Sequence, residues 1–252
     1  MEQIYRLHYR AQLKEEYSIA DLQEAAGQCE NNIRELQKAG KLLTAALYYA
    51  DKMLFLYYEA MGEQRAVVEP IKAAESRETD LLLESGEDVQ LTAPQPMDFL
   101  GALSSYLMPW PGQNKTRLWV HMYHIYYHNI PEGVEDWKRT AIPQMRRGRI
   151  AFLREDKLFS YTYYHRAIVE EGLLTGDRYQ SIALHENILF SYFEEPKTFS
   201  NVRRCEEEES EVIKDWLAVN PEAHFIHMPE GKGENFMFLP AVFALGIEDM
   251  QA

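Results

Sequence analysis

The strongest constraint on the fold is an internal repeat. The segment TAALYYADKMLFLYYE, residues 44–59, aligns without a gap on YQSIALHENILFSYFE, residues 179–194, at an offset of 135. In each segment a short polar turn, containing Asp51 or Glu186, separates two apolar runs, and this spacing predicts a β-hairpin. Two such hairpins so far apart predict two similar folding units. Four positions carry identical residues in the two copies: Leu54 and Leu189, Phe55 and Phe190, Tyr57 and Tyr192, Glu59 and Glu194.

The segments around each hairpin follow the same order. Residues 4–12 alternate as a strand does, and residues 18–39 carry a helical apolar stripe that ends at Gly40. In the second copy, residues 150–154 predict a strand and residues 156–174 a helix. An acidic helical region, a Met-Pro step and an apolar strand (residues 117–127 or 236–245) follow each hairpin. We therefore predict an α+β fold of two tandem ferredoxin-like βαββαβ units that form an α/β-barrel pseudo-dimer within one chain.

Turn-forming residues suggest where the units begin and end. We predict a first unit over residues 1–128 and a second over residues 148–252. Residues 129–147, with Pro131, Gly133 and Pro143, form the predicted linker. Residues 63–96 are longer than the matching part of the second copy and end in LTAPQP, which indicates an insertion.

Charge and composition exclude several classes of protein. The net charge of -14 disfavours nucleic acid and anionic membranes as partners. No run of about 18 apolar residues is present, and the first ten residues alternate instead of forming a signal-peptide core, so we expect a cytoplasmic protein with no membrane contact. Cys29 and Cys205 are too few and too far apart for a disulfide framework. We expect two reduced cysteines, no metal and no cofactor.

The second copy resembles the rhamnose mutarotase family, which epimerises sugars on a dimeric α/β-barrel. The shared pattern is Tyr161-x-x-x-His165 on the first helix, followed by Ile168 and Glu171. The resemblance covers roughly residues 149–245 and differs from the family in a shorter strand-to-helix connection. It implies catalytic roles for His165, Tyr161 and Tyr179, substrate contacts for Glu171 and Trp216, and a small-molecule substrate such as a monosaccharide. Trp216 is further from the Met-Pro step than in the family.

The chemistry of these residue types agrees with that role. Opening an aldose ring requires one group to remove a proton and another to deliver one, and a histidine can do either near neutral pH. Tyr161, His165 and Ile168 are spaced i, i+4 and i+7, so their side chains share one face of a helix. The alternative is that this face is simply the buried side of the helix, with His165 as a core residue.

The first copy lacks this pattern. The offset of 135 places Glu30 at the position of His165 and Thr44 at that of Tyr179. We therefore expect the first unit to be a structural partner. A fused pair can make within one chain the sheet contact that the family makes between two chains, so the protein can act as a monomer.

Three other groups of residues are candidate sites. His121, His124 and His128 could bind a metal on a helix, but the aromatic and β-branched composition favours a strand, in which His124 and His128 share a face about 13 Å apart. The acidic residues 206–209 and Glu211 predict a solvated helix face. Trp110 lies in a Met-Pro-Trp-Pro-Gly corner and could stack on a sugar.

Three functions remain compatible with the sequence. The first is a mutarotase-like isomerase with His165 as the acid/base. The second is a haem-handling or other small-molecule barrel in which His165 is a ligand. The third is a binding protein without catalysis.

Overall fold

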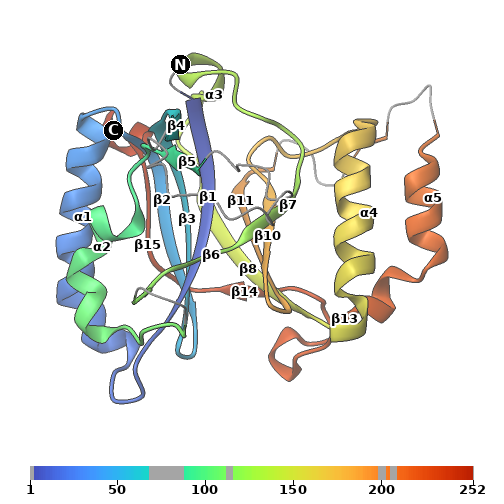
Figure 1. The fold of residues 1–252 in the computed structure, drawn as a ribbon, viewed down its shortest axis with the longest axis horizontal. Helices are drawn as coiled ribbons and strands as arrows, with labels where there is room; N and C mark the ends of the chain where they lie inside the picture. The colour runs from blue at the N-terminus through green and yellow to red at the C-terminus, as the bar shows by residue number, and fades with distance from the viewer. Residues whose placement is uncertain (1–2, 68–87, 112–115, 198–202, 205–208, 252) are drawn as a thin grey trace, which may run out of the picture.

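The fold has four layers, with two β-sheets between two layers of helices (Figure 1). The computed structural model describes residues 3–67, 88–111, 116–197, 203–204 and 209–251. Helices α1 (Gln23–Lys38) and α2 (Pro96–Leu100) cover the outer face of one sheet. Helices α4 (Leu158–Glu171) and α5 (Glu211–Ala218) cover the outer face of the other. Among the described residues, no helix is long and apolar enough to cross a membrane.

The first sheet has five strands in the order β15-β2-β3-β1-β6. It contains β1 (Gln3–Gln12), β2 (Leu42–Ala50), β3 (Met53–Gly62), β6 (Val120–His121) and β15 (Ala241–Gly246), all antiparallel to their neighbours. The predicted first strand, first helix and first hairpin are confirmed. The predicted insertion pairs β4 (Gln64–Val67) with β5 (Asp88–Leu91), and residues 68–87 between them lie outside the described residues.

The second sheet has the order β13-β8-β11-β10-β7, with β14 also paired to β8. Its strands are β7 (Tyr123–Tyr127), β8 (Met145–Leu153), β10 (Ser181–His185), β11 (Ile188–Glu195), β13 (Phe225–Ile226) and β14 (Met237–Leu239). The predicted second hairpin is confirmed as β10 and β11. The remaining elements are short: η1 (Ile19–Leu22), η2 (Gly101–Tyr106), α3 (Val134–Trp137), η3 (Glu155–Lys157), β9 (Leu174–Thr175), β12 (Arg203–Arg204), η4 (Pro221–His224), η5 (Pro229–Gly231) and η6 (Ile247–Gln251).

The two halves exchange strands, which the sequence analysis did not foresee. Each predicted closing strand is split: β6 pairs with β1 but β7 pairs with β10, and β14 pairs with β8 but β15 pairs with β2. The predicted α+β fold with two sheets is therefore confirmed only in part, because neither unit keeps all of its strands in its own sheet. Each sheet takes one edge strand from the other half of the chain, so the predicted boundary after residue 128 does not separate the sheets.

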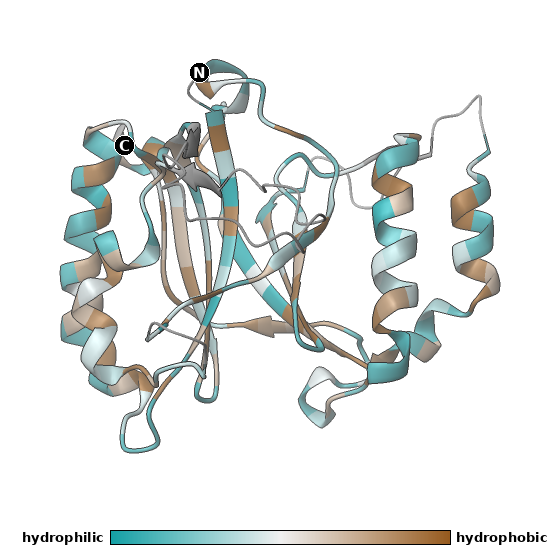
Figure 2. Ribbon diagram, viewed as in Figure 1, coloured by the Kyte–Doolittle hydropathy of each residue, from teal (hydrophilic) through white to brown (hydrophobic). Residues whose placement is uncertain are grey.

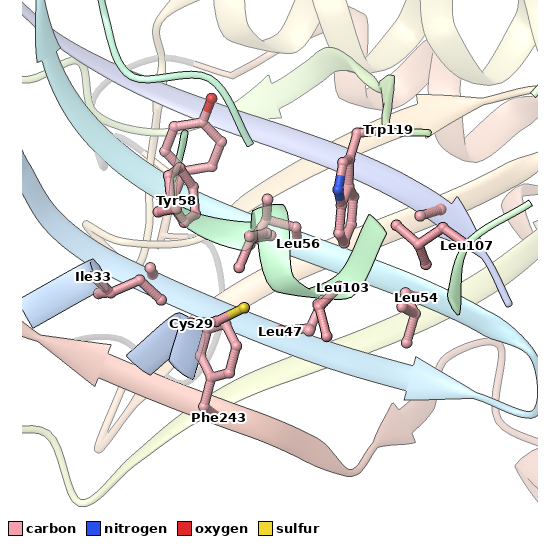
Figure 3. Packing of buried hydrophobic residues seen from close by; sticks show 14 of the residues in the cluster. Cys29, Ile33, Leu47, Leu54, Leu56, Tyr58, Leu103, Leu107, Trp119 and Phe243 are labelled. Atoms are coloured by element: carbon pink, nitrogen blue, oxygen red, sulfur yellow. The ribbon is translucent and has the colours of Figure 1, made fainter. Parts of the chain in front are cut away.

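Alternation along the strands divides the apolar residues into three layers. One cluster lies between the first sheet and its helices, and its side chains from α1, β2 and β3 point toward one another (Figure 3). A second lies between the two sheets, and a third lies under α4. The alternation of hydrophilic and hydrophobic segments along α1 and α4 fits helices with one buried side (Figure 2).

The repeated hairpin residues meet where the two sheets face each other. The rings of Tyr57 and Tyr192 stack with centroids 3.8 Å apart and planes at 11°. Each phenol donates a hydrogen bond to the glutamate two residues further on, at 2.6 Å to Glu59 and 2.7 Å to Glu194. Three of the four identical pairs, at Phe55, Tyr57 and Glu59 and their counterparts, thus build the contact between the sheets, while Leu54 and Leu189 face the helices.

Arg139 joins the two glutamates. Its guanidinium donates to Glu59 at 2.6 Å and to Glu194 at 2.7 Å, and all three side chains are at most 5% exposed. Burial alone would raise the pKa of Glu59, but the Arg139 charge and its hydrogen bonds lower it to about 2. The predicted linker therefore supplies a central residue of the core.

Between the sheets, one position has a large side chain in the first sheet and a glycine in the second. His8, on β1, is fully buried and lies 3.1 Å from the Ser181 hydroxyl through Nε2. The matching position on β8 is Gly148, and the ring of Tyr48 fills its place, because a Cβ on Gly148 would lie 2.5 Å from that ring.

Candidate functional site

Helix α4 presents a stacked pair of side chains to the second sheet. Tyr161 and His165, one turn apart, have ring centroids 3.8 Å apart and planes at 20°. The His165 Nδ1 lies 2.9 Å from the Tyr161 carbonyl oxygen, which can only accept, so Nδ1 carries the hydrogen and Nε2 is left with a lone pair. Tyr161 and Ile168 are buried, as the helical spacing predicts.

Aromatic rings from two other elements lie beside His165. Trp216 of α5 lies 5.1 Å from it and Tyr126 of β7 lies 5.5 Å from it, both edge to face. Tyr126 is in turn hydrogen-bonded to His128, at 2.7 Å between the hydroxyl oxygen and Nε2. Burial lowers the pKa of His165 to about 4, so its imidazole is neutral at neutral pH. The structure thus brings Tyr161, His165 and Trp216 together and adds Tyr126, which the sequence analysis missed.

Tyr179 does not join this group. It precedes β10, and its ring lies under the guanidinium of Arg139 at 4.0 Å and beside Trp137 at 5.2 Å. Its hydroxyl donates to the Lys138 carbonyl at 3.3 Å. These contacts are on the side of the second sheet that faces the first sheet, away from α4. The expectation that Tyr179 and His165 share a pocket is wrong, because the strand begins at Ser181 and leaves Tyr179 in the preceding turn.

Glu171 is engaged in a structural contact. Its carboxylate accepts a hydrogen bond from the Ser210 hydroxyl, and the same hydroxyl accepts one from the Ile213 amide at 3.0 Å. Ser210 is the N-cap of α5, so Glu171 ties the end of α4 to the start of α5. The role of Glu171 as a substrate contact stays a prediction beside this structural role.

The helix-facing sides of the two sheets differ in chemistry at matching positions. The strand registers, in which Glu59 pairs with Arg6 and Glu194 with Arg146, relate β1 to β8 at an offset of 140. At five matching positions on this side, the first sheet has an apolar or aromatic side chain, whereas the second has four polar side chains and one phenylalanine. The matching pairs are Leu7 and Arg147, Tyr9 and Arg149, Leu56 and Ser191, Tyr58 and Phe193, and Ala60 and Glu195. Elsewhere on this side the second sheet is apolar, with Ala151, Leu153 and Leu189.

The helices show the same difference. Both end at a glycine with positive φ, Gly40 at 69° and Gly172 at 70°. Aligning these glycines places Cys29 and Ile33, both fully buried, where Tyr161 and His165 stand. The sequence offset of 135 had placed Glu30 there, which is wrong because the lengths of the connections differ between the halves. The first half therefore has an apolar core where the second half has a phenol and an imidazole.

The three histidines near the closing strand do not form a metal site. His124 lies against His8, with ring centroids 4.6 Å apart, while His128 bonds to Tyr126. A β-bulge opposite Ile182 and Ala183 breaks the alternation, so the expectation that His124 and His128 share a face is wrong. In the described part of the chain, no cluster of three or more suitable side chains could hold a metal ion.

Other candidate residues lie apart from α4. Trp110 packs over the guanidinium of Arg10 at 4.6 Å and beside His185. Cys29 is a buried free cysteine. Cys205 and the acidic residues 206–208 lie outside the described residues. The best-defined cavities of the described structure are lined by other residues and not by His165.

Comparison with known proteins gives no family. No protein-family model and no curated protein matches the chain. A crystal structure of a "putative monooxygenase" from Lactobacillus acidophilus NCFM is similar with a TM-score of 0.39 and 8% identity, over 97% of both chains. A second "putative monooxygenase", from Fusobacterium nucleatum subsp. nucleatum ATCC 25586, has a TM-score of 0.38 and 10% identity, over 97% of this chain and 94% of that one. At this level of similarity, neither structure bears on the activity of this chain.

Proposed function

We propose that the second half of the chain binds a small molecule beside α4 and interconverts the anomers of an aldose, as a mutarotase does. The observation that carries this proposal is the chemical difference between the halves. At matching positions the first half has Cys29 and Ile33, and the second half has Tyr161 and His165. A core residue needs no phenol and imidazole there, since the first half packs without them.

In the proposed mechanism, His165 accepts a proton and Tyr161 donates one. The neutral His165 accepts the proton of the anomeric hydroxyl at Nε2, while the bond from the anomeric carbon to the ring oxygen breaks and that oxygen receives a proton. Burial raises the pKa of the Tyr161 phenol, so Tyr161 stays protonated and can donate. The open-chain aldehyde then closes on either face, which returns the protons and gives both anomers.

The same proposal includes the origin of the fold. We propose that both halves derive from one ferredoxin-like unit, because the strand order β2-β3-β1-β6 in the first sheet matches β10-β11-β8-β13 in the second. The first half then completes the pseudo-dimer, so a single cytoplasmic chain could act as a monomer.

Anomer exchange measured by NMR on a panel of aldoses tests this proposal. We expect His165→Ala to slow exchange of the cognate sugar by roughly 10² to 10⁴, the usual effect of losing a positioned acid/base. His227→Ala is the matched control, since His227 is paired with Glu222 at 2.7 Å on the surface and should exchange sugars at the parental rate. A parent protein that accelerates no aldose would contradict the proposal.

A binding protein without catalysis is the second candidate. The rings of Tyr161, Tyr126 and Trp216 pack closely around His165, which favours a role in the core. In that case His165→Ala would lower the melting temperature, and neither the parent nor the variant would accelerate anomer exchange. A Soret band in the purified protein would instead indicate bound haem, and its loss in His165→Ala would identify His165 as the ligand.

A further inference from the structure

Arg149 is a partly buried cation that has no acidic partner in the part of the chain that the structure describes. It projects from β8 toward the helices, and its Nε donates one long hydrogen bond, 3.4 Å, to the Ser191 hydroxyl. The guanidinium otherwise lies against two rings, 4.4 Å from Phe236 and 5.1 Å from Phe193. Among the described residues, no carboxylate lies within ion-pair distance of it. Removing a charge from water is costly unless a partner of opposite charge is supplied.

Arg147 shows that an arginine on the same side of this strand can have an acidic partner. It lies two residues earlier on the same side of β8 and is paired with Glu195 at 3.1 Å. At the position of Arg149, the first sheet has Tyr9, which stacks on Tyr58. The fold therefore does not need a charged side chain at this position. Packing alone does not explain why the second sheet has an arginine there.

Two further donors lie close to Arg149. The ammonium of Lys197 lies 4.1 Å from the centroid of Phe193, the ring that Arg149 also contacts. The Tyr161 hydroxyl has no hydrogen-bond partner among the described residues although its side chain is 2% exposed. Burial lowers the pKa of both Arg149 and Lys197, and the charge of Arg149 lowers the pKa of Lys197 further. The acidic groups nearest Lys197 are Asp177 and Glu195, and Glu195 is already paired.

We propose that Arg149 binds an anionic group of the ligand, a carboxylate or a phosphate, with Lys197 and the Tyr161 hydroxyl as additional donors. A guanidinium offers parallel N–H donors that match two oxygens of either anion. This inference deepens the proposed function and rests on it. Because Tyr161 stacks on His165 and also lies near Arg149, one ligand can place its anionic group at Arg149 and a hydroxyl at His165. The substrate class is then an aldose that carries a carboxylate or a phosphate.

Binding of three matched sugars tests the inference: glucose, glucuronate and glucose 6-phosphate, measured by saturation-difference NMR and titration calorimetry. We expect at least one of the two anionic sugars to bind more tightly than glucose. Arg149→Gln should weaken that binding about 10- to 100-fold, the effect of losing one charge-assisted hydrogen-bonding group. Arg147→Gln is the matched control and should bind as the parent does. Arg149→Lys should recover part of the affinity, since it restores the charge without the fork.

The failure of this inference differs from the failure of the proposed function. Preference for glucose over both anionic sugars, or equal weakening by Arg149→Gln and Arg147→Gln, would overturn the role of Arg149 and leave His165 as the acid/base. Anionic sugars that bind through Arg149 but whose anomers exchange no faster would support this site and refute the mutarotase. The anion site would be refuted if the parent bound none of the three sugars and if inorganic phosphate and acetate also left its melting temperature unchanged. Circular dichroism shows whether each variant is folded.

Discussion

Replacing Arg139 by methionine should be among the most destabilising single changes in the chain. It removes the guanidinium that bonds to both Glu59 and Glu194, whose side chains are 0% and 5% exposed. Two buried carboxylates would then face each other without a counter-ion. Breaking a buried ion pair in this way costs about 3–5 kcal/mol, and for a chain of this length each kcal/mol lowers the melting temperature by about 2–4 °C. We therefore expect a decrease of about 6–20 °C.

The pH dependence of this loss distinguishes charge from packing. In the parent, the folded pKa of Glu59 is about 2, below its unfolded value, so its contribution is present at neutral pH and is lost as the pH falls through about 4.5 toward 2. In Arg139→Met the sign reverses, because burial, no longer opposed by the Arg139 charge, raises the pKa of Glu59, and protonation of Glu59 relieves its repulsion with Glu194. The variant should therefore regain stability as the pH falls from 7 to 5, whereas the parent should gain no stability over this range.

Urea unfolding followed by circular dichroism measures both effects. In a Glu59→Gln, Glu194→Gln background, Arg139→Met should cost far less, since no carboxylate is left unpaired. Arg149→Met is a second comparison: it removes a cation that has no acidic partner in the described structure, so it should cost little or even stabilise. An equal cost of Arg139→Met in both backgrounds, at both pH values, would refute the assignment of its effect to charge.

Three further expectations follow from the structure. Gly148→Ala should lower stability by about 1–3 kcal/mol, because its Cβ would lie 2.5 Å from the Tyr48 ring, whereas Gly27→Ala, with nothing within 4 Å, should raise helix stability by about 0.5–1 kcal/mol; thermal melts of the two variants compare them. His165 is protonated below about pH 6.5 in the unfolded chain but only near pH 4 in the folded protein, so the free energy of unfolding should decrease as the pH falls from about 6.5 to 4. Any rate that depends on His165 should be independent of pH above about pH 5. His165→Gln should remove both effects. Glu171→Gln should lower stability by about 1 kcal/mol and leave ligand affinity unchanged, and a weakened affinity at parental stability would support its role as a substrate contact.

The repeat and the hairpin residues could be predicted because they are local patterns. The alternation of Leu54, Phe55 and Tyr57 places side chains on alternate sides of a strand wherever that strand lies. The exchange of β7 and β15 could not be predicted, since a strand has the same alternation whichever sheet it joins. Arg139 was missed for a similar reason: proline and glycine around it indicate a linker but not where the linker packs.

The candidate site was predicted only in part. Helical spacing identified Tyr161 and His165, because residues four apart on a helix lie side by side. Tyr179 was misplaced because β10 begins only at Ser181, so Tyr179 lies in the preceding turn, where its contacts depend on the packing of residues 137–139. Tyr126 and Arg149 come from strands distant in sequence, and their neighbours become known only from the strand registers.

The exchange of strands also determines when the fold can be completed during synthesis. Four strands of the first sheet belong to the first half, but its edge at β2 is closed only by β15, in which Gly246 pairs with Thr44. The N–H and C=O groups on that side of β2 therefore stay unpaired while nearly all of the second half is being made. A nascent chain in this state offers a ready template to other nascent strands, so chaperone protection matters most until the last strand leaves the ribosome.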